Sequence, residues 1–231
     1  MSPRLDRDGR TDPGPVSHRS LVERFAALDT ATTHEASGRR GAVDPAIKPV
    51  WPAPRTVGRA FTAACHPGDN LAIHRAVALA GEGDILVVDA GGHLGGYWGE
   101  ILTVAALSRG IAALVLDGGC RDLEGIERRR FPVWARGVYV AGCEKQAPGT
   151  VTQPIVCGGV AVSQGDIVVA DRDGVVIVTA ESAEATLAAA ERRAAHEQET
   201  IERVRAGELT LDLLGLRPSL DARQIDDEAT R

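Results

Sequence analysis

The middle of the chain alternates between short apolar runs and glycine-rich loops, each of which leads into a helical segment. An apolar run at 85–90 precedes a loop at 91–99 and a helix at 100–109, and a second run at 111–116 precedes a loop at 117–122. Apolar runs of this length are typical of buried strands, and strands separated by helices pair in parallel. The pattern predicts an α/β fold in which both loops lie at one edge of a sheet.

The flanking segments extend this pattern on both sides. Helical spacing begins at Leu21, another helix is expected at 70–80, and a helix following the second loop should end near Arg130. Four prolines keep residues 44–55 extended. Apolar and β-branched runs predict further strands at 57–64, at 133–136, at 138–140 and within 151–178.

Three regions follow from these patterns. Residues 1–18 are polar and are expected to form a disordered leader, and residues 19–180 are expected to form the α/β domain. Residues 181–231 are expected to form a helical arm and tail, with a long charged helix over 181–206. This helix has only a thin apolar stripe to bury against its own domain, so we expect it to lie across a neighbouring subunit.

Composition excludes several classes of protein. The chain has 26 Lys and Arg against 32 Asp and Glu, a net charge of −6, which argues against a nucleic-acid or anionic-membrane surface. No apolar run reaches the roughly 18 residues of a membrane span, and the N-terminus lacks the apolar core of a secretory signal. The four cysteines show no zinc-site spacing. We therefore expect a cytoplasmic protein with free thiols.

The two glycine-rich loops deliver charged residues to the predicted sheet edge. Glu100 starts the helix after the first loop, and Arg121 and Asp122 end the second. Two carboxylates without His or Cys suit a hard cation such as Mg²⁺ or Mn²⁺, and the arginine suits an anionic substrate. The backbone amides of Ile101 and Leu102, at a helix N-terminus, could hold a carboxylate. The glycines do not follow a dinucleotide or P-loop pattern.

A purely structural interpretation of the same residues is also open. Arg121 and Asp122 could form a surface ion pair, and Glu100 could be an acid favoured by the helix dipole. His34 and His74 are expected to be capping or packing groups rather than ligands. Cys120 has no histidine nearby in sequence to make it a nucleophile, although Arg121 could lower its pKa. The basic run at 128–130 is expected to be a solvated helix face rather than an RNA-binding site.

The chain resembles the class II pyruvate aldolases, which include 4-hydroxy-4-methyl-2-oxoglutarate aldolase and 4-carboxy-4-hydroxy-2-oxoadipate aldolase. The same superfamily contains the regulator of ribonuclease activity A. The resemblance rests on the spacing from Glu100 to the pair Arg121-Asp122 and extends from about residue 29 to 217. Five further segments carry it: Asp29–Ala36, Pro67–His74, Gly83–Val88, Phe131–Trp134 and Gly207–Asp212.

The resemblance implies a layered β/β/α sandwich, similar to swivelling domains, with a C-terminal helical arm. It implies homotrimers or dimers of trimers, that is homohexamers, with the active site between subunits. Asp122 would ligate Mg²⁺ or Mn²⁺ directly, and Glu100 would hold metal-bound water. An acid of the neighbouring subunit's arm, Glu197 or next to it Glu199, would complete the water shell.

The resemblance also implies how the substrate is bound and cleaved. Arg121 would contact the keto oxygen of pyruvate, and the segment from Gly99 to the amides of Ile101 and Leu102 would hold its carboxylate. The implied reaction is the retro-aldol cleavage of a 4-hydroxy-2-oxo acid, a small molecule, with oxaloacetate decarboxylation as a side activity. The glycine-rich, aromatic loop 93–98 should shape the pocket beyond the pyruvyl unit. The alternative is a regulator that binds an RNA-degrading enzyme and has no chemistry of its own.

Overall fold

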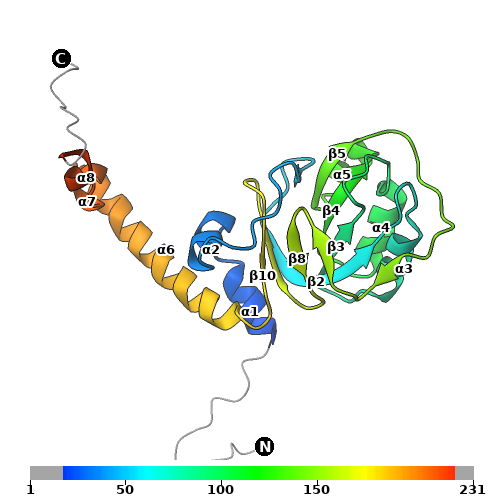
Figure 1. Ribbon diagram of the computed structural model, residues 1–231, viewed down its shortest axis with the longest axis horizontal. Coiled ribbons are helices and arrows are strands. Elements are labelled where there is room, and N and C mark those ends of the chain that lie inside the picture. Colours follow the sequence, from blue (N-terminus) through cyan, green and yellow to red (C-terminus); the bar gives the residue numbers. More distant parts are fainter. Residues whose placement is uncertain (1–17, 222–231) are drawn as a thin grey trace, which may run out of the picture. The chain divides into compact units, whose positions relative to one another are not determined.

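The computed structural model describes residues 18–221 of the chain (Figure 1). The predicted leader lies outside the described residues except for His18, and so does the tail from residue 222. The helices of the described residues are α1 (His18–Phe25), α2 (Thr30–Ala36), α3 (Leu71–Leu79), α4 (Glu100–Ser108), α5 (Leu123–Arg128), α6 (Ala183–Arg205), α7 (Thr210–Leu213) and α8 (Arg217–Asp221). The strands of the described residues are β1 (Lys48–Pro49), β2 (Thr56–Ala64), β3 (Asp84–Asp89), β4 (Ala113–Cys120), β5 (Val133–Val138), β6 (Thr150–Val151), β7 (Ile155–Cys157), β8 (Val160–Val162), β9 (Ile167–Ala170) and β10 (Val175–Val178).

The chain divides into two compact units, residues 1–190 and residues 191–231. The boundary between the units falls within α6. The extent of α6, Ala183–Arg205, confirms the long helix predicted over 181–206. Our division of the chain at residue 180 into a domain and an arm stays a prediction. Across residues 18–221, every helix is too short or too polar to cross a membrane.

A mixed sheet organises the first unit. In the described part of the chain it has eight strands in the order β1-β5-β4-β3-β2-β9-β10, with β6 paired to β2 off this path. The strands β2, β3, β4 and β5 run parallel to one another, whereas β1, β9 and β10 pair antiparallel. The predicted α/β fold with parallel pairing in the middle of the chain is confirmed.

Alternating side chains of the central strands bury both faces of this sheet. Leu86 and Val88 of β3 pack into a core with α3, α4 and α5, whose buried residues include Ile73 and Ile126. Their neighbours along the strand pack instead into a second core that includes the hairpin β7–β8. The helices therefore cover one face and the hairpin covers the other (Figure 1).

The second glycine-rich loop is shorter than predicted. Residues 117–120 belong to β4, and only Arg121 and Asp122 separate this strand from α5. A Cβ atom at Gly119 would lie 2.5 Å from the carbonyl oxygen of Gly95, and Cys120 forms a bridge with Trp98. The glycine pair thus lets the first loop pack directly on the strand, where Gly-Gly usually marks a turn.

One strand, β5 (Val133–Val138), contains the strand predicted at 133–136 and ends at the first residue of the strand predicted at 138–140, which does not form as a separate strand. Gly137 does not interrupt it, because it pairs with Gly119 in the parallel ladder and is covered by the side chain of Leu94. The other predicted elements are confirmed within a few residues. These are the strand at 57–64, the helix at 70–80, the helix starting near 21 and the helix after the second loop.

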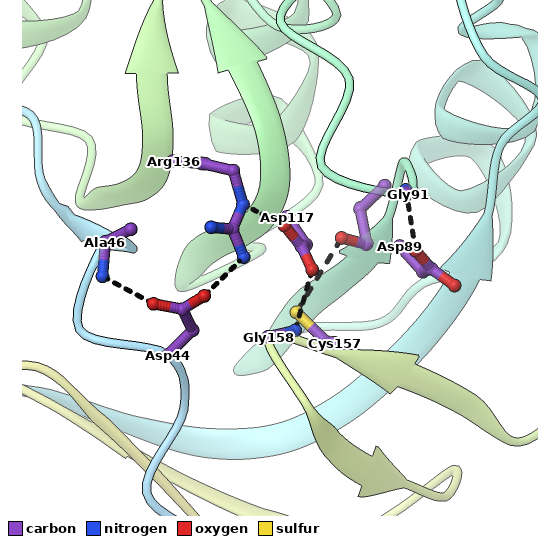
Figure 2. Close-up of polar contacts among 9 residues, drawn as sticks. Asp44, Ala46, Asp89, Gly91, Asp117, Arg136, Cys157 and Gly158 are labelled. Atoms are coloured by element: carbon purple, nitrogen blue, oxygen red, sulfur yellow. Dashed lines mark hydrogen bonds and ion pairs between the residues drawn. The ribbon is translucent and has the colours of Figure 1, made fainter.

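An ion-pair network lies against the first glycine-rich loop (Figure 2). The Asp117 carboxylate of β4 binds Arg136 of β5 through Oδ1 and accepts a 2.8 Å hydrogen bond from the Gly158 amide through Oδ2. Arg136 also lies 2.9 Å from Asp44, in the segment before β1. A Cβ atom at Gly92 would lie 3.5 Å from Nε of Arg136, so the loop rests on this network. The start of the loop is therefore held in place by β4, β5 and the hairpin.

Candidate active site

A pocket of about 170 Å³ lies where the chain leaves the carboxyl ends of the parallel strands β2 to β5. This edge is where α/β sheets bind ligands. Five residues predicted from the sequence line it together: Gly99, Ile101, Leu102, Arg121 and Asp122. The fold therefore brings the start of α4 and the turn after β4 to one place.

Asp122 joins the two segments of the pocket. Its Oδ2 accepts a 3.1 Å hydrogen bond from the Glu100 amide, the first residue of α4. Its backbone has φ 59° and ψ 41°, in the left-handed region that aspartate tolerates better than most residues. Such a conformation is unfavourable for a residue with a side chain and is often found at functional sites. The strained backbone places the carboxylate at the N-terminus of α4.

Gly99 leaves space for this carboxylate. A Cβ atom at Gly99 would lie only 2.4 Å from Oδ2 of Asp122. The φ of Gly99 is −161°, an extended value open to any residue, so the requirement for glycine here is steric and not conformational. Any larger residue at this position must displace the Asp122 carboxylate.

Glycines also shape the path of the Arg121 side chain. A Cβ atom at Gly96 would lie 2.8 Å from Cδ of Arg121, and one at Gly142 would lie 3.1 Å from Nη1. The Arg121 amide donates a 2.9 Å hydrogen bond to the Trp98 carbonyl, which fixes the backbone below the side chain. Nε lies 3.9 Å from Oδ2 of Asp122, and 45% of the side chain is exposed. The guanidinium is thus available to a ligand in the pocket.

The N-terminus of α4 offers backbone amides to the same pocket. Thr103 is the residue whose amide donates to the Gly99 carbonyl, at 3.0 Å. The amides before it, those of Ile101 and Leu102, belong to the first turn, where no intrahelical acceptor exists. Together with the helix dipole they form a position suited to an anion.

Glu100 does not line the pocket. Its Oε1 lies 3.0 Å from Arg128 and 2.9 Å from Arg129, and its chain lies against Gly125. Hydrogen bonds from Arg128 and then Arg129 hold the pKa of this carboxyl below its usual value. Two arginines of the predicted solvated run thus bind Glu100, and its role as a holder of metal-bound water stays a prediction.

The other candidates lie elsewhere or are inert. Glu197 belongs to the second unit, where it forms a 2.7 Å ion pair with Arg193 on the same helix. Its role at a neighbouring subunit's site stays a prediction, as does that of Glu199. Burial raises the pKa of Cys120 to about 12, so its thiol stays protonated and is a poor nucleophile.

Sequence reasoning missed three polar residues of the pocket: Asn70, His74 and Lys145. Asn70 was expected only as the start of a helix, and His74 as a capping or packing group. Asn70 is the N-cap of α3 and His74 lies one turn later in this helix, which is otherwise mostly apolar. That polar pair on one helix face was the available signal. Lys145 lies after β5, in a segment without regular pattern, and nothing in the sequence placed it here.

We expect Gly99→Ala to damage the site without strain elsewhere. The added methyl group must displace the Asp122 carboxylate, and overpacking of this kind costs about 1–3 kcal/mol. Thermal melting should therefore show a Tm below that of the unmodified protein. Any activity that depends on Asp122 should also fall below that of the unmodified protein. Gly81→Ala is the matched control, because its Cβ would meet its nearest atom at 3.6 Å. Equal melting temperatures for the two variants would contradict this geometry.

Comparison with known proteins places the chain in a family. The model of the RraA-like family, described as Aldolase/RraA, matches residues 26–177. The chain belongs to the Aldolase/RraA family. The matched residues include every residue that lines the pocket and all of the described strands except the last residue of β10. They do not include α6. The pocket is therefore part of the family's common domain.

Individual proteins resemble the chain over most of its length. A protein of Halalkalibacterium halodurans, named "Putative 4-hydroxy-4-methyl-2-oxoglutarate aldolase", is 32% identical over 179 residues, 77% of this chain and 85% of that protein. The structure of an uncharacterized protein from Pseudomonas syringae superposes with a TM-score of 0.74 at 28% identity, covering 83% of this chain and 94% of that one. The RNA-processing inhibitor RraA from Thermus thermophilus superposes with a TM-score of 0.60 at 27% identity, over 64% and 91%. The chain is thus similar in sequence to a protein named for an enzyme and in structure to one named for an inhibitor.

The pocket fits a hard divalent cation held by few protein ligands. Within residues 18–221, no three His, Cys, Asp or Glu side chains are grouped to hold a metal ion. Asp122 is the acidic residue among those described that line the pocket. Mg²⁺ commonly binds through one or two carboxylates and keeps its water or substrate oxygens, whereas structural zinc needs several His or Cys ligands. The donor set suits Mg²⁺ or Mn²⁺ and not zinc.

Proposed function

We propose that the chain is a divalent-metal-dependent class II pyruvate aldolase. It cleaves a 4-hydroxy-2-oxo acid into pyruvate and a second carbonyl compound. The observation that carries this proposal is the pocket in which Arg121, Asp122 and the first amides of α4 meet, in a chain of the Aldolase/RraA family. Membership of that family, with relatives named for aldolase activity, supports a small-molecule substrate.

Each group in the pocket has a separate task in this reaction. The amides of Ile101 and Leu102 bind the carboxylate of the pyruvyl unit, and Arg121 binds its keto oxygen. Asp122 holds Mg²⁺ or Mn²⁺, which supplies Lewis acidity toward the keto oxygen when it is bound. As the bond from C3 to C4 breaks, its electron pair moves toward that oxygen, and the fixed charge of Arg121 stabilises the enolate that forms.

The hydroxyl proton at C4 must leave in the same reaction. We propose that Glu100 and, from a neighbouring subunit, Glu197 hold the water that takes this proton, and that a proton returns from this water to C3 of the enolate to complete pyruvate. Oxaloacetate yields the same enolate when it loses CO₂, so decarboxylation of oxaloacetate is the expected side activity. We further propose a swivelling-domain-like β/β/α class for the layered fold and a cytoplasmic location for the protein.

A second candidate function is regulation of an RNA-degrading enzyme by binding, without chemistry. The likeness to the Thermus thermophilus RNA-processing inhibitor favours it. The charged pocket favours the aldolase, because a protein that acts only by surface contact needs no strained Asp122 at a helix N-terminus that lines a pocket.

Pyruvate release from a panel of 4-hydroxy-2-oxo acids tests the two candidates. An aldolase releases pyruvate from at least one member of the panel, above the rate without protein, when Mg²⁺ or Mn²⁺ is present. Pyruvate should also form from oxaloacetate. A protein that releases no pyruvate from either source with either metal is not an aldolase, and the regulator then becomes the better proposal.

We predict that the protein assembles as a homotrimer or homohexamer. In the second unit, Ile201, Val204, Leu209 and Leu214 are each 39% to 57% exposed, an apolar surface that a subunit interface would cover. Light scattering at micromolar protein should give three or six times the mass of one chain. A monomer mass under these conditions would refute the prediction, and a dimer mass would refute it equally.

A further inference from the structure

Two buried polar atoms at the pocket have no hydrogen-bond partner in the described part of the chain. They are Oδ1 of Asn70 and Nε2 of His74. Both residues line the pocket, and Asn70 is only 5% exposed. Buried polar side-chain atoms are usually paired, because leaving one unpaired destabilises the folded protein. An exception at a ligand pocket indicates that the partner is supplied by the ligand.

The two atoms come from one turn of helix. Asn70 is the N-cap of α3 and His74 is four residues later, so both side chains lie on the same helix face. The Asn70 side chain has a defined orientation, since its Nδ2 donates a 2.8 Å hydrogen bond to the Tyr97 carbonyl. Reversing the amide would set oxygen against oxygen at that contact. Oδ1 is therefore the free end of the amide.

The chemistry of the pocket restricts what can pair with these atoms. Oδ1 of Asn70 can only accept a hydrogen bond, so a carboxylate cannot bind it. Burial, and then the charge of Lys145, lower the pKa of His74, which keeps the imidazole neutral at pH 7. Arg121 and Lys145 line the same pocket and favour an anionic ligand, so the group that meets these two atoms is not an ammonium. A neutral hydroxyl satisfies both atoms when it donates to Oδ1 of Asn70 and accepts from the imidazole tautomer that carries its proton on Nε2.

We propose that Asn70 and His74 form a hydroxyl-binding subsite, which recognises the C4 hydroxyl of the substrate. The inference rests on the proposed aldolase function and extends it to the part of the substrate beyond the pyruvyl unit. Arg121 and the α4 amides bind the half that becomes pyruvate, and the hydroxyl-binding subsite binds the half that leaves. Selection then depends on a group that oxaloacetate lacks.

Comparing aldol cleavage with oxaloacetate decarboxylation tests whether His74 binds the substrate hydroxyl. Cleavage of 4-hydroxy-4-methyl-2-oxoglutarate, or of the best substrate in the panel, needs the hydroxyl, whereas oxaloacetate decarboxylation does not. We expect His74→Leu to lower kcat/KM for cleavage about 10- to 100-fold, the effect of leaving a substrate hydroxyl unpaired in a buried site. Decarboxylation should change less than about twofold, within the range of a substitution that removes no contact to that substrate.

Two further variants serve as controls. His74→Gln keeps an amide that can reach the position of Nε2 and should restore part of the cleavage rate. His34→Leu replaces another partly buried histidine, on α2 and outside the pocket, and should leave the ratio of the two activities unchanged. Since Nε2 of His74 has no partner to lose, the Tm of His74→Leu should not fall.

The possible outcomes are distinct. If His74→Leu lowers both activities equally, the hydroxyl-binding subsite is wrong while the aldolase proposal stands. If both activities fall and additional Mg²⁺ restores them, His74 ligates the metal, which also overturns the inference. If the unmodified protein releases pyruvate from neither substrate, the proposed function fails and the inference fails with it. Loss of cleavage alone, with partial recovery in His74→Gln, supports it.

Discussion

Arg121→Ala is expected to lower kcat for pyruvate release by about 10²–10³, equivalent to roughly 2.7–4 kcal/mol of transition-state stabilisation. The guanidinium lies along Gly96 and Gly142. In the proposed mechanism it carries a fixed positive charge where the enolate oxygen develops its negative charge. Arg121→Lys should recover little of the rate, because an ammonium group cannot reproduce the planar set of donors. Steady-state kinetics on a cleaved 4-hydroxy-2-oxo acid measures the effect.

A melting curve on the same preparations separates catalysis from folding. If Arg121 served only as the surface partner of Asp122, at 3.9 Å with both side chains 45% exposed, the pair would contribute about 0–1 kcal/mol to stability and nothing to rate. We expect lost activity at an unchanged Tm. A well-folded Arg121→Ala protein with a kcat near that of the unmodified protein would remove Arg121 from the mechanism.

Removal of divalent metal is expected to abolish pyruvate release. In the proposed mechanism the Asp122 carboxylate, which lines the pocket, and the anionic substrate supply the oxygen ligands for Mg²⁺ or Mn²⁺, and the charge of the ion stabilises the enolate. Treatment with a chelator should stop the reaction, and added Mg²⁺ or Mn²⁺ should restore it. Zn²⁺ should restore less, because among the described residues no three His, Cys, Asp or Glu side chains are grouped to hold it.

The fold itself should not depend on this metal. The two cores on either side of the sheet are built from apolar side chains, so the Tm of the metal-free protein should stay close to that of the metal-loaded one, apart from the stabilisation that any bound ligand brings. Full pyruvate release from protein that has been exhaustively stripped of metal would contradict the proposed mechanism.

The central sheet could be predicted because its strands are buried on both faces. The runs at 85–90 and 111–116 are continuously apolar, as fully buried parallel strands are, and the structure confirms both. The end of β4 could not be predicted, because Gly118 and Gly119 carry the local signal of a turn. Their real role depends on the loop that packs on them, a contact between segments far apart in the sequence.

The pocket was predictable only where one short stretch of chain carries the information. The spacing from Gly99 to Asp122 spans one helix and one strand, and the structure does bring Gly99, Arg121 and Asp122 to a single pocket. Asn70 and His74 reach that pocket through the packing of α3 against the sheet, which local sequence does not encode. The orientation of Glu100 toward Arg128 also depends on packing between α4 and α5.

The central claim is that this pocket stabilises the enolate of pyruvate, and exchange of the methyl protons of pyruvate with deuterium oxide tests it without knowledge of the native substrate. Proton NMR of pyruvate with the protein and Mg²⁺ or Mn²⁺ should show loss of the methyl signal faster than in buffer with metal alone. The exchange should fall to the buffer rate in Arg121→Ala and in metal-free protein. Methyl protons that exchange no faster with the intact protein and metal than without the protein would contradict the account.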